Sequence, residues 1–168
     1  DCMFLSIAID DPRHGGGGRE RQKQRRMLVG GSNGRLFVIN PTTRALEYVH
    51  ALHDDAINAV HLSAGFAVTG GADRKLRVWP LDFSAHFLEA EHEGAVTAIH
   101  ASPDGLKLLI GTDSGTIGVL DVPTLRPVAA MMGVHVMHAA ASFCATALAA
   151  ADGQLYTCGY GADGQLGH

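Results

Sequence analysis

Residues 70–79 read Gly-Gly-Ala-Asp-Arg-Lys-Leu-Arg-Val-Trp, and this stretch decides how the whole chain is interpreted. It aligns without a gap with residues 30–39, which read Gly-Gly-Ser-Asn-Gly-Arg-Leu-Phe-Val-Ile. Residues 111–120 and 149–158 continue the pattern, so that its last position returns at 39, 79, 120 and 158. A fixed period of about 40 residues is the signature of a repeat architecture. Repeat proteins mostly present surfaces to partners rather than pockets to substrates.

Each repeat reads as short strands joined by turns. In the second repeat we expect strands over residues 56–62, 66–69, 75–79 and 86–90, because apolar and polar residues alternate there and turn residues separate the runs. Four strands within about 40 residues make one blade of a β-propeller. The sequence therefore predicts an all-β chain that forms a partial propeller, about three and a half blades of four antiparallel strands.

The period also divides the chain. We expect a first blade over residues 1–50, with an insertion at 10–26, then blades over 51–91 and 92–133, and an incomplete blade with a Gly-rich tail over 134–168. We interpret the chain as a piece of a longer protein that supplies the rest of the propeller.

The composition of the chain indicates the cellular compartment in which we expect the protein. The chain has 168 residues, 46% of them hydrophobic, but no apolar run long enough to cross a bilayer. Its three cysteines, Cys2, Cys144 and Cys158, lack metal-binding spacing and favour a reducing compartment. We therefore expect a protein of the cytoplasm or cytoskeleton with no membrane partner.

Charge is distributed unevenly. The net charge is −4, yet the stretch from Arg13 to Arg26 holds six basic residues and a single acid. A basic loop on an acidic body is a candidate partner-binding element. Its candidate residues are Arg19, Arg21, Lys23, Arg25 and Arg26. The alternative is an ordinary solvated loop. Nucleic acid is the less favoured partner, since no aromatic residues interleave for base stacking.

The second repeat resembles the WD-repeat family. In that family a His precedes the first strand, a hydroxyl lies on the second, an Asp in the next turn and a Trp on the third. His53, Thr69, Asp73 and Trp79 fill these four places, and the resemblance implies a chain of hydrogen bonds inside the blade. The other repeats keep only parts of this structural tetrad: His92 and Ser114 in the third, His135 and Asp152 in the fourth.

Two further resemblances suggest functions. Residues 76–84, 87–94, 102–106 and 118–122 resemble a member of the WD-repeat family from centrioles and cilia, in which a microtubule-binding module precedes tandem propellers. The tail over residues 152–167 is similar to a repeat of the regulator of chromosome condensation family, another propeller. The second resemblance implies a regulatory chromatin or nucleotide-exchange role as the alternative.

Catalysis, metals and cofactors are not predicted. His53, Thr69 and Asp73 are the residue types of a hydrolase triad, but strand alternation turns the hydroxyl into the blade, where a substrate has no access. The histidine pairs recur at repeat positions and lack zinc-like spacing, and the glycine pairs precede no phosphate-binding Lys. We therefore predict a non-catalytic scaffold for other proteins, with tubulin or microtubules among them.

Overall fold

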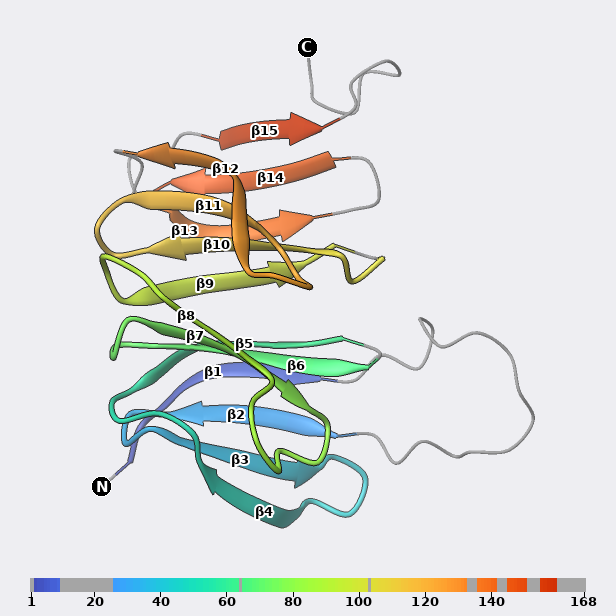
Figure 1. Ribbon diagram of the computed structural model, residues 1–168. Helices are drawn as coiled ribbons and strands as arrows, with labels where there is room; N and C mark the ends of the chain where they lie inside the picture. The colour runs from blue at the N-terminus through green and yellow to red at the C-terminus, as the bar shows by residue number, and fades with distance from the viewer. Residues whose placement is uncertain are drawn as a thin grey trace, which may run out of the picture.

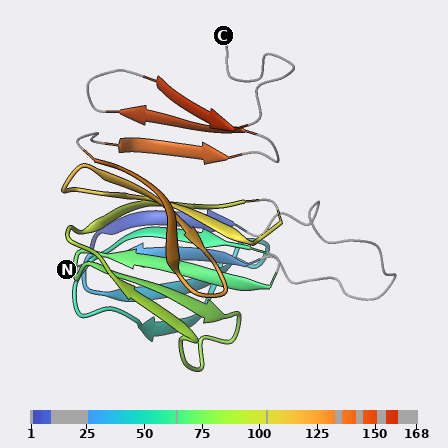
Figure 2. The ribbon, with the colours of Figure 1, turned by 45° about the horizontal axis from the view of Figure 1, so that its top comes forward.

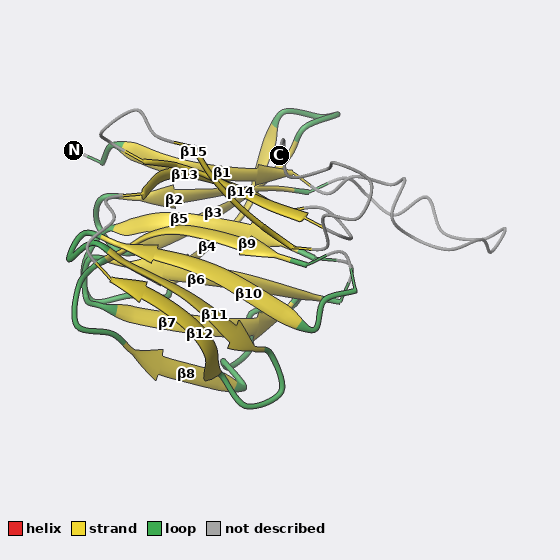
Figure 3. Ribbon diagram, turned by 90° about the horizontal axis from the view of Figure 1, so that it is seen from above, coloured by secondary structure: helices red, strands yellow, loops and turns green. Residues whose placement is uncertain are grey.

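The computed structural model describes residues 2–9, 26–63, 65–102, 104–132, 136–141, 145–150 and 155–159, and from residue 127 onward it describes the backbone alone. These residues form strands and loops, and no helix occurs among them (Figure 3). The strands make four antiparallel sheets that follow one another through the molecule (Figure 1). The prediction of an all-β partial propeller is confirmed. The division into units 1–50, 51–91, 92–133 and 134–168 stays a prediction.

Consecutive strands are neighbours in every sheet. The first sheet contains β1 (Phe4–Ile9), β2 (Met27–Gly31), β3 (Arg35–Asn40) and β4 (Ala45–Ala51). The second contains β5 (Ile57–Leu62), β6 (Phe66–Gly71), β7 (Lys75–Pro80) and β8 (Leu88–Glu91). The third contains β9 (Val96–Ala101), β10 (Lys107–Thr112), β11 (Thr116–Asp121) and β12 (Arg126–Met132). The fourth contains β13 (Val136–Ala141), β14 (Ala145–Ala150) and β15 (Leu155–Gly159).

The first strand of each sheet lies on the inner side of the arc. β1 lies against β5, β5 against β9 and β9 against β13, so the sheets meet along these strands (Figure 2). Their last strands lie at the outer side because each sheet adds its strands in chain order. Sheets related in this way are the blades of a propeller.

Two apolar cores hold the first three sheets together. Leu28, Leu36 and Val38 of the first sheet pack with Ile57, Ala67 and Trp79 of the second. On its other face, the second sheet packs Val68, Leu76 and Val78 against the third sheet, which contributes Val96, Leu108, Ile110 and Leu120. Both faces of the second sheet are therefore buried.

The fourth strand of the second sheet begins later than the sequence pattern predicts. The expected strand covered residues 86–90, whereas β8 begins at Leu88. The chain first turns, with the N–H of Phe83 donating to the carbonyl of Pro80 at 3.0 Å. Phe83 adopts φ 54° there and buries its ring against His50 and Trp79, so a core contact delays the strand.

Candidate functional site

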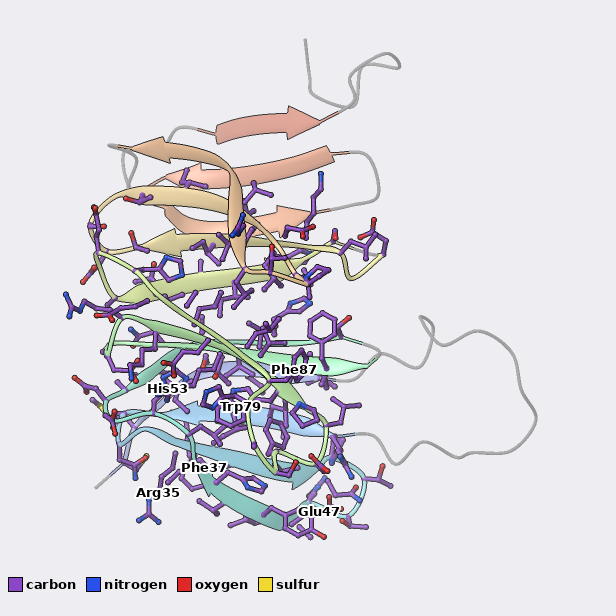
Figure 4. All side chains as sticks on the ribbon, in the orientation of Figure 1. Arg35, Phe37, Glu47, His53, Trp79 and Phe87 are labelled. Atoms are coloured by element: carbon purple, nitrogen blue, oxygen red, sulfur yellow. The ribbon has the colours of Figure 1, made fainter. Side chains whose placement is uncertain are left out.

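His53, Thr69, Asp73 and Trp79 come together at the second sheet. His53 lies just before β5, Thr69 on β6, Asp73 in the β6–β7 turn and Trp79 on β7. His53 Nδ1 is 2.9 Å from Asp73 Oδ1, and His53 Nε2 is 2.7 Å from Thr69 Oγ1. Trp79 Nε1 donates to the same hydroxyl at 2.8 Å. His53 and Trp79 occupy the layer between the first and second sheets (Figure 4).

The donors and acceptors of this network can be ordered. The indole N–H of Trp79 can only donate, so Thr69 Oγ1 accepts from it and is free to donate its own proton to His53 Nε2. His53 Nδ1–H then donates to the Asp73 carboxylate. This order requires a neutral imidazole. It agrees with the lowered pKa of His53, which burial produces against the opposing attraction of Asp73.

Asp73 carries the negative end of the network. Burial acts to raise its pKa, but the hydrogen bond from His53 and those from the N–H groups of Lys75 and Asp54 outweigh burial, so the pKa is lowered. The carboxylate therefore remains ionised and fixes both the His53 ring and the turn that follows β6.

Arg77 extends the network, although sequence reasoning did not single it out. Its Nη1 donates to the carbonyl of Leu52, its Nε donates to Glu89 at 2.6 Å, and Nη1 lies 3.7 Å from Asp73. Arg77 is a buried cation and is two residues before Trp79 on the same strand face. That spacing was the available signal, but the sequence could not show which acceptors surround the guanidinium.

The arrangement opposes nucleophilic chemistry. Thr69 is fully buried, and its hydroxyl already bonds to both His53 and Trp79. A triad nucleophile needs an accessible oxygen beside oxyanion donors. The geometry instead links β6, β7 and the segment before β5 through buried hydrogen bonds, which rigidify a core when every group is satisfied.

The third sheet does not close the same network. Ser114 Oγ lies 2.8 Å from Thr112 Oγ1, and the buried Nε2 of His92 has no partner among the described residues. Ile110 and Leu120 stand at the positions of Thr69 and Trp79, so the hydroxyl that would meet His92 is absent. Burial lowers the pKa of His92. A hollow of about 170 Å³ beside it is lined by Glu91, His92, Glu93, Thr112 and Thr116, below the roughly 300–1,000 Å³ of ligand pockets.

Several predicted residues lie outside the described part of the chain. These are His135 and Asp152 of the fourth repeat and Arg19, Arg21, Lys23 and Arg25 of the basic insertion. Arg26, the last residue of the insertion, is described. Its Nη1 donates to the carbonyl of Leu81 at 2.9 Å, so this arginine is anchored to the second sheet.

A histidine pair joins two inner strands. His61 on β5 and His100 on β9 have ring centroids 5.0 Å apart in an edge-on arrangement. Burial, and then the nearby His100, lower the pKa of His61 to about 4. The repeat positions of these residues were visible in the sequence, but their contact depends on how the two sheets pack.

Over the described ranges, no group of three His, Cys, Asp or Glu side chains is placed to hold a metal ion. Within those ranges no helix has the length and apolar character needed to span a membrane.

The sequence model of the family described as "WD domain, G-beta repeat" matches residues 46–80 and 84–121, which include the whole network. The chain contains WD40 repeats. The resemblance inferred from His53, Thr69, Asp73 and Trp79 is thereby confirmed.

Curated relatives match part of these WD40 repeats, and one of them has a centriolar name. Centriole proteome protein 16 of Chlamydomonas reinhardtii is 52% identical over 99 residues, which cover 59% of this chain and 5% of that protein. WD repeat-containing protein 90 of Xenopus tropicalis is 58% identical over 69 residues, which cover 41% of this chain and 4% of that protein. The chain thus spans a small part of the length of these relatives.

Solved structures share the fold of the WD40 repeats. The computationally designed Ika4 protein superposes with a TM-score of 0.75 and 20% identity, covering 95% of this chain and 92% of the designed one. The designed Ika8 protein gives a TM-score of 0.74, also at 20% identity, over 94% of this chain and 46% of that chain. At this identity the likeness concerns the fold alone.

Proposed function

We propose that this chain is part of a non-catalytic protein-interaction scaffold in a centriolar or ciliary assembly associated with microtubules. The observation that carries the proposal is the 52% identity to Centriole proteome protein 16 across 59% of the chain. Partners contact a protein at its surface, mostly through loops that a rigid fold holds in place.

The buried network supports a scaffold rather than an enzyme. Its reactive groups are satisfied by one another, and the hollow near His92 is small for a substrate. We assign His53, Thr69, Asp73 and Trp79 a structural role, which is to hold the blade rigid so that its loops and edges keep a fixed shape.

The basic insertion supplies a candidate contact with microtubules, whose surface is acidic. We propose that Arg19, Arg21, Lys23 and Arg25 attract that surface, while Arg26, anchored to Leu81, holds the end of the insertion on the second sheet. Clustered cations raise encounter rates with an acidic partner by long-range attraction.

Localisation tests the scaffold proposal. The chain fused to a fluorescent protein is expected to concentrate at centrioles or basal bodies of ciliated cells. A uniform distribution in cells that retain normal centrioles would contradict the proposal.

Co-sedimentation with microtubules tests the insertion separately. Changing Arg19, Arg21, Lys23 and Arg25 to Glu is expected to reduce pelleting, whereas Arg26 is left intact to preserve its bond to Leu81. A control variant makes the same charge change at two exposed residues of the body, Lys107 and Arg126, and is compared with an insertion variant changed at Arg21 and Lys23 alone. Equal pelleting by the two variants would remove the insertion from the proposed contact.

The chromatin or nucleotide-exchange alternative rests on residues 152–167. Most of this stretch lies outside the described residues, and β15 adds backbone pairing that any blade would have. Nothing in the described residues favours this alternative over the scaffold role.

A further inference from the structure

The outer strand of the first sheet, β4, has a free edge. β4 pairs with β3 on one side, and no described strand pairs with it on the other. An edge strand carries unpaired N–H and C=O groups, which form a template for an additional strand. Proteins usually protect such an edge with charged side chains or by covering it.

β4 lacks the protection that β8 has in the second sheet. β8 carries Glu89 and Glu91, which form ion pairs with Arg77 and Arg74. In β4 the charged residue is Glu47, which accepts a hydrogen bond from Asn40. The apolar side chains of β4 are exposed: Leu46 is 56%, Tyr48 60% and Val49 40% accessible.

Each of these side chains is the last member of a row of apolar residues that runs from strand to strand across the sheet. Val49 lies opposite Phe37 and Leu46 opposite Ile39, while Tyr48 lies opposite Val38. A strand added beside β4 would continue these rows with its own side chains. Cross-strand apolar and aromatic pairs each stabilise a sheet by about 0.2–1 kcal/mol.

An arginine lies near each end of β4. Arg35 lies opposite Ala51 at the end of the strand, and Arg44 immediately precedes its first residue. Both are exposed, and neither forms an ion pair with a described residue. Figure 4 places Arg35 and Glu47 near opposite ends of this part of the sheet.

We propose that the β4 edge binds an extended peptide segment of a partner protein, with apolar side chains at alternate positions and acidic residues at both ends. The segment adds a strand to the sheet, and its acidic ends meet Arg35 and Arg44. A second copy of this chain is a poor occupant, because β4 paired with β4 in either direction would bring arginines together. This inference rests on the proposed scaffold function and names its partner class.

Binding of a designed peptide to the whole chain tests the proposed site at the β4 edge. The probe is fluorescently labelled Asp-Asp-Val-Thr-Val-Thr-Val-Asp-Asp, and binding is measured by fluorescence anisotropy. A second peptide replaces each Asp with Lys, and a third replaces the central Val with Pro, which removes a backbone donor. Binding of the first peptide alone is expected. Equal binding of all three, or of none, would overturn the proposal.

Variants locate the binding edge. Val49→Lys is expected to weaken binding about tenfold, since it puts a charge into an apolar cross-strand row. Leu106→Lys is the matched control, because Leu106 is 55% accessible and lies just before β10 in the third sheet. It is expected to change affinity less than about twofold. Equal loss in both variants would overturn the assignment to β4.

Analytical ultracentrifugation tests the alternative occupant of the β4 edge, a second copy of this chain. A concentration-dependent dimer that Val49→Lys dissolves would overturn the proposal and assign the edge to a second copy. The peptide result is independent of cellular localisation. Failure of peptide binding with normal centriolar enrichment would reject the β4 inference alone, whereas binding without enrichment would reject the centriolar role.

Discussion

Thr69 shows how one side chain can hold a blade together. Its hydroxyl accepts the indole N–H of Trp79 and bonds to His53, which in turn bonds to Asp73. These hydrogen bonds meet at the Thr69 hydroxyl, and Thr69 has no solvent exposure. A buried polar group that loses its partner costs more than an average hydrogen bond contributes.

Thr69→Val should therefore destabilise the protein strongly. The replacement keeps the shape of the side chain but leaves Trp79 Nε1 and His53 Nε2 unpaired. We expect the free energy of unfolding to fall by about 2 to 4 kcal/mol. Urea unfolding followed by the fluorescence of Trp79, the single tryptophan, measures this change.

Thr97→Val is the matched control for Thr69→Val. Thr97 is an exposed strand threonine whose hydroxyl donates to the carbonyl of Gly111. We expect its replacement to cost less than about 1 kcal/mol. Similar losses at the two positions would show that the network adds nothing beyond ordinary bonds.

Stability should fall as the pH is lowered from about 6.5 to about 4. His61 has a folded pKa of about 4, and the pKa values of His53 and His92 are also lowered. The unfolded chain, with histidine pKa values near 6.5, then binds more protons than the folded one across this range. Stability present above pH 6.5 is lost as the pH falls toward the folded pKa.

Thermal melts at pH 7.5, 6, 5 and 4.5 would follow this loss. His61→Gln removes one of the titrating groups, so its melting temperature is expected to depend less steeply on pH than that of the unchanged protein. Parallel curves for the two proteins would contradict the role of the His61–His100 contact.

At the scale of the element, glycines set the distance between sheets. Gly30 and Gly70 occupy equivalent repeat positions on β2 and β6, and each lies against the first strand of the next sheet. A Cβ on Gly30 would meet Ile57, and one on Gly70 would lie 2.8 Å from Val96 Cβ and 2.9 Å from Ile99 Cδ1. A larger residue there must push the neighbouring inner strand away.

Gly70→Ala should accordingly destabilise the contact between the second and third sheets. Overpacking of this kind costs about 1–3 kcal/mol. Gly65→Ala is the control, because a Cβ there meets nothing within 4 Å. Chemical denaturation of both variants tests the comparison, and an unchanged midpoint for Gly70→Ala would show that the sheets separate without cost.

At the scale of the whole molecule, each sheet is stabilised by its neighbours. The second sheet is covered on both faces by the two apolar cores. The first sheet packs Leu28, Leu36 and Val38 on the second sheet, while Ile7 and Ile9 on its other face are 60% and 55% accessible. In repeat-like folds, the stability of each unit depends on its interfaces with the neighbouring units.

Amide hydrogen exchange should be slower in the second sheet, which is covered on both faces, than in the first. Amides of β6 and β7 are expected to exchange more slowly than those of β2 and β3, although both pairs are central strands of their sheets. Mass spectrometry of peptides covering residues 27–40 and 66–80 provides the measurement. Equal protection of the two pairs would indicate that the sheets unfold as one unit.

Strand positions and the WD resemblance could be predicted because they depend on local pattern. Alternation of apolar and polar residues fixes which side chains share a face, and the Gly-Gly-Ala-Asp run marks the β6–β7 turn. The four residues of the network could be named in the same way. The sequence pattern shows that such residues face inward, but it carries no distance between their atoms.

The tertiary structure decided the contacts between segments far apart in the chain. It placed Arg77 beside the carbonyl of Leu52, His61 beside His100, and left His92 Nε2 without a described partner. It also left Leu46, Tyr48 and Val49 exposed on β4. Periodicity determines the face of a strand, whereas the packing of one sheet on the next determines what that face meets.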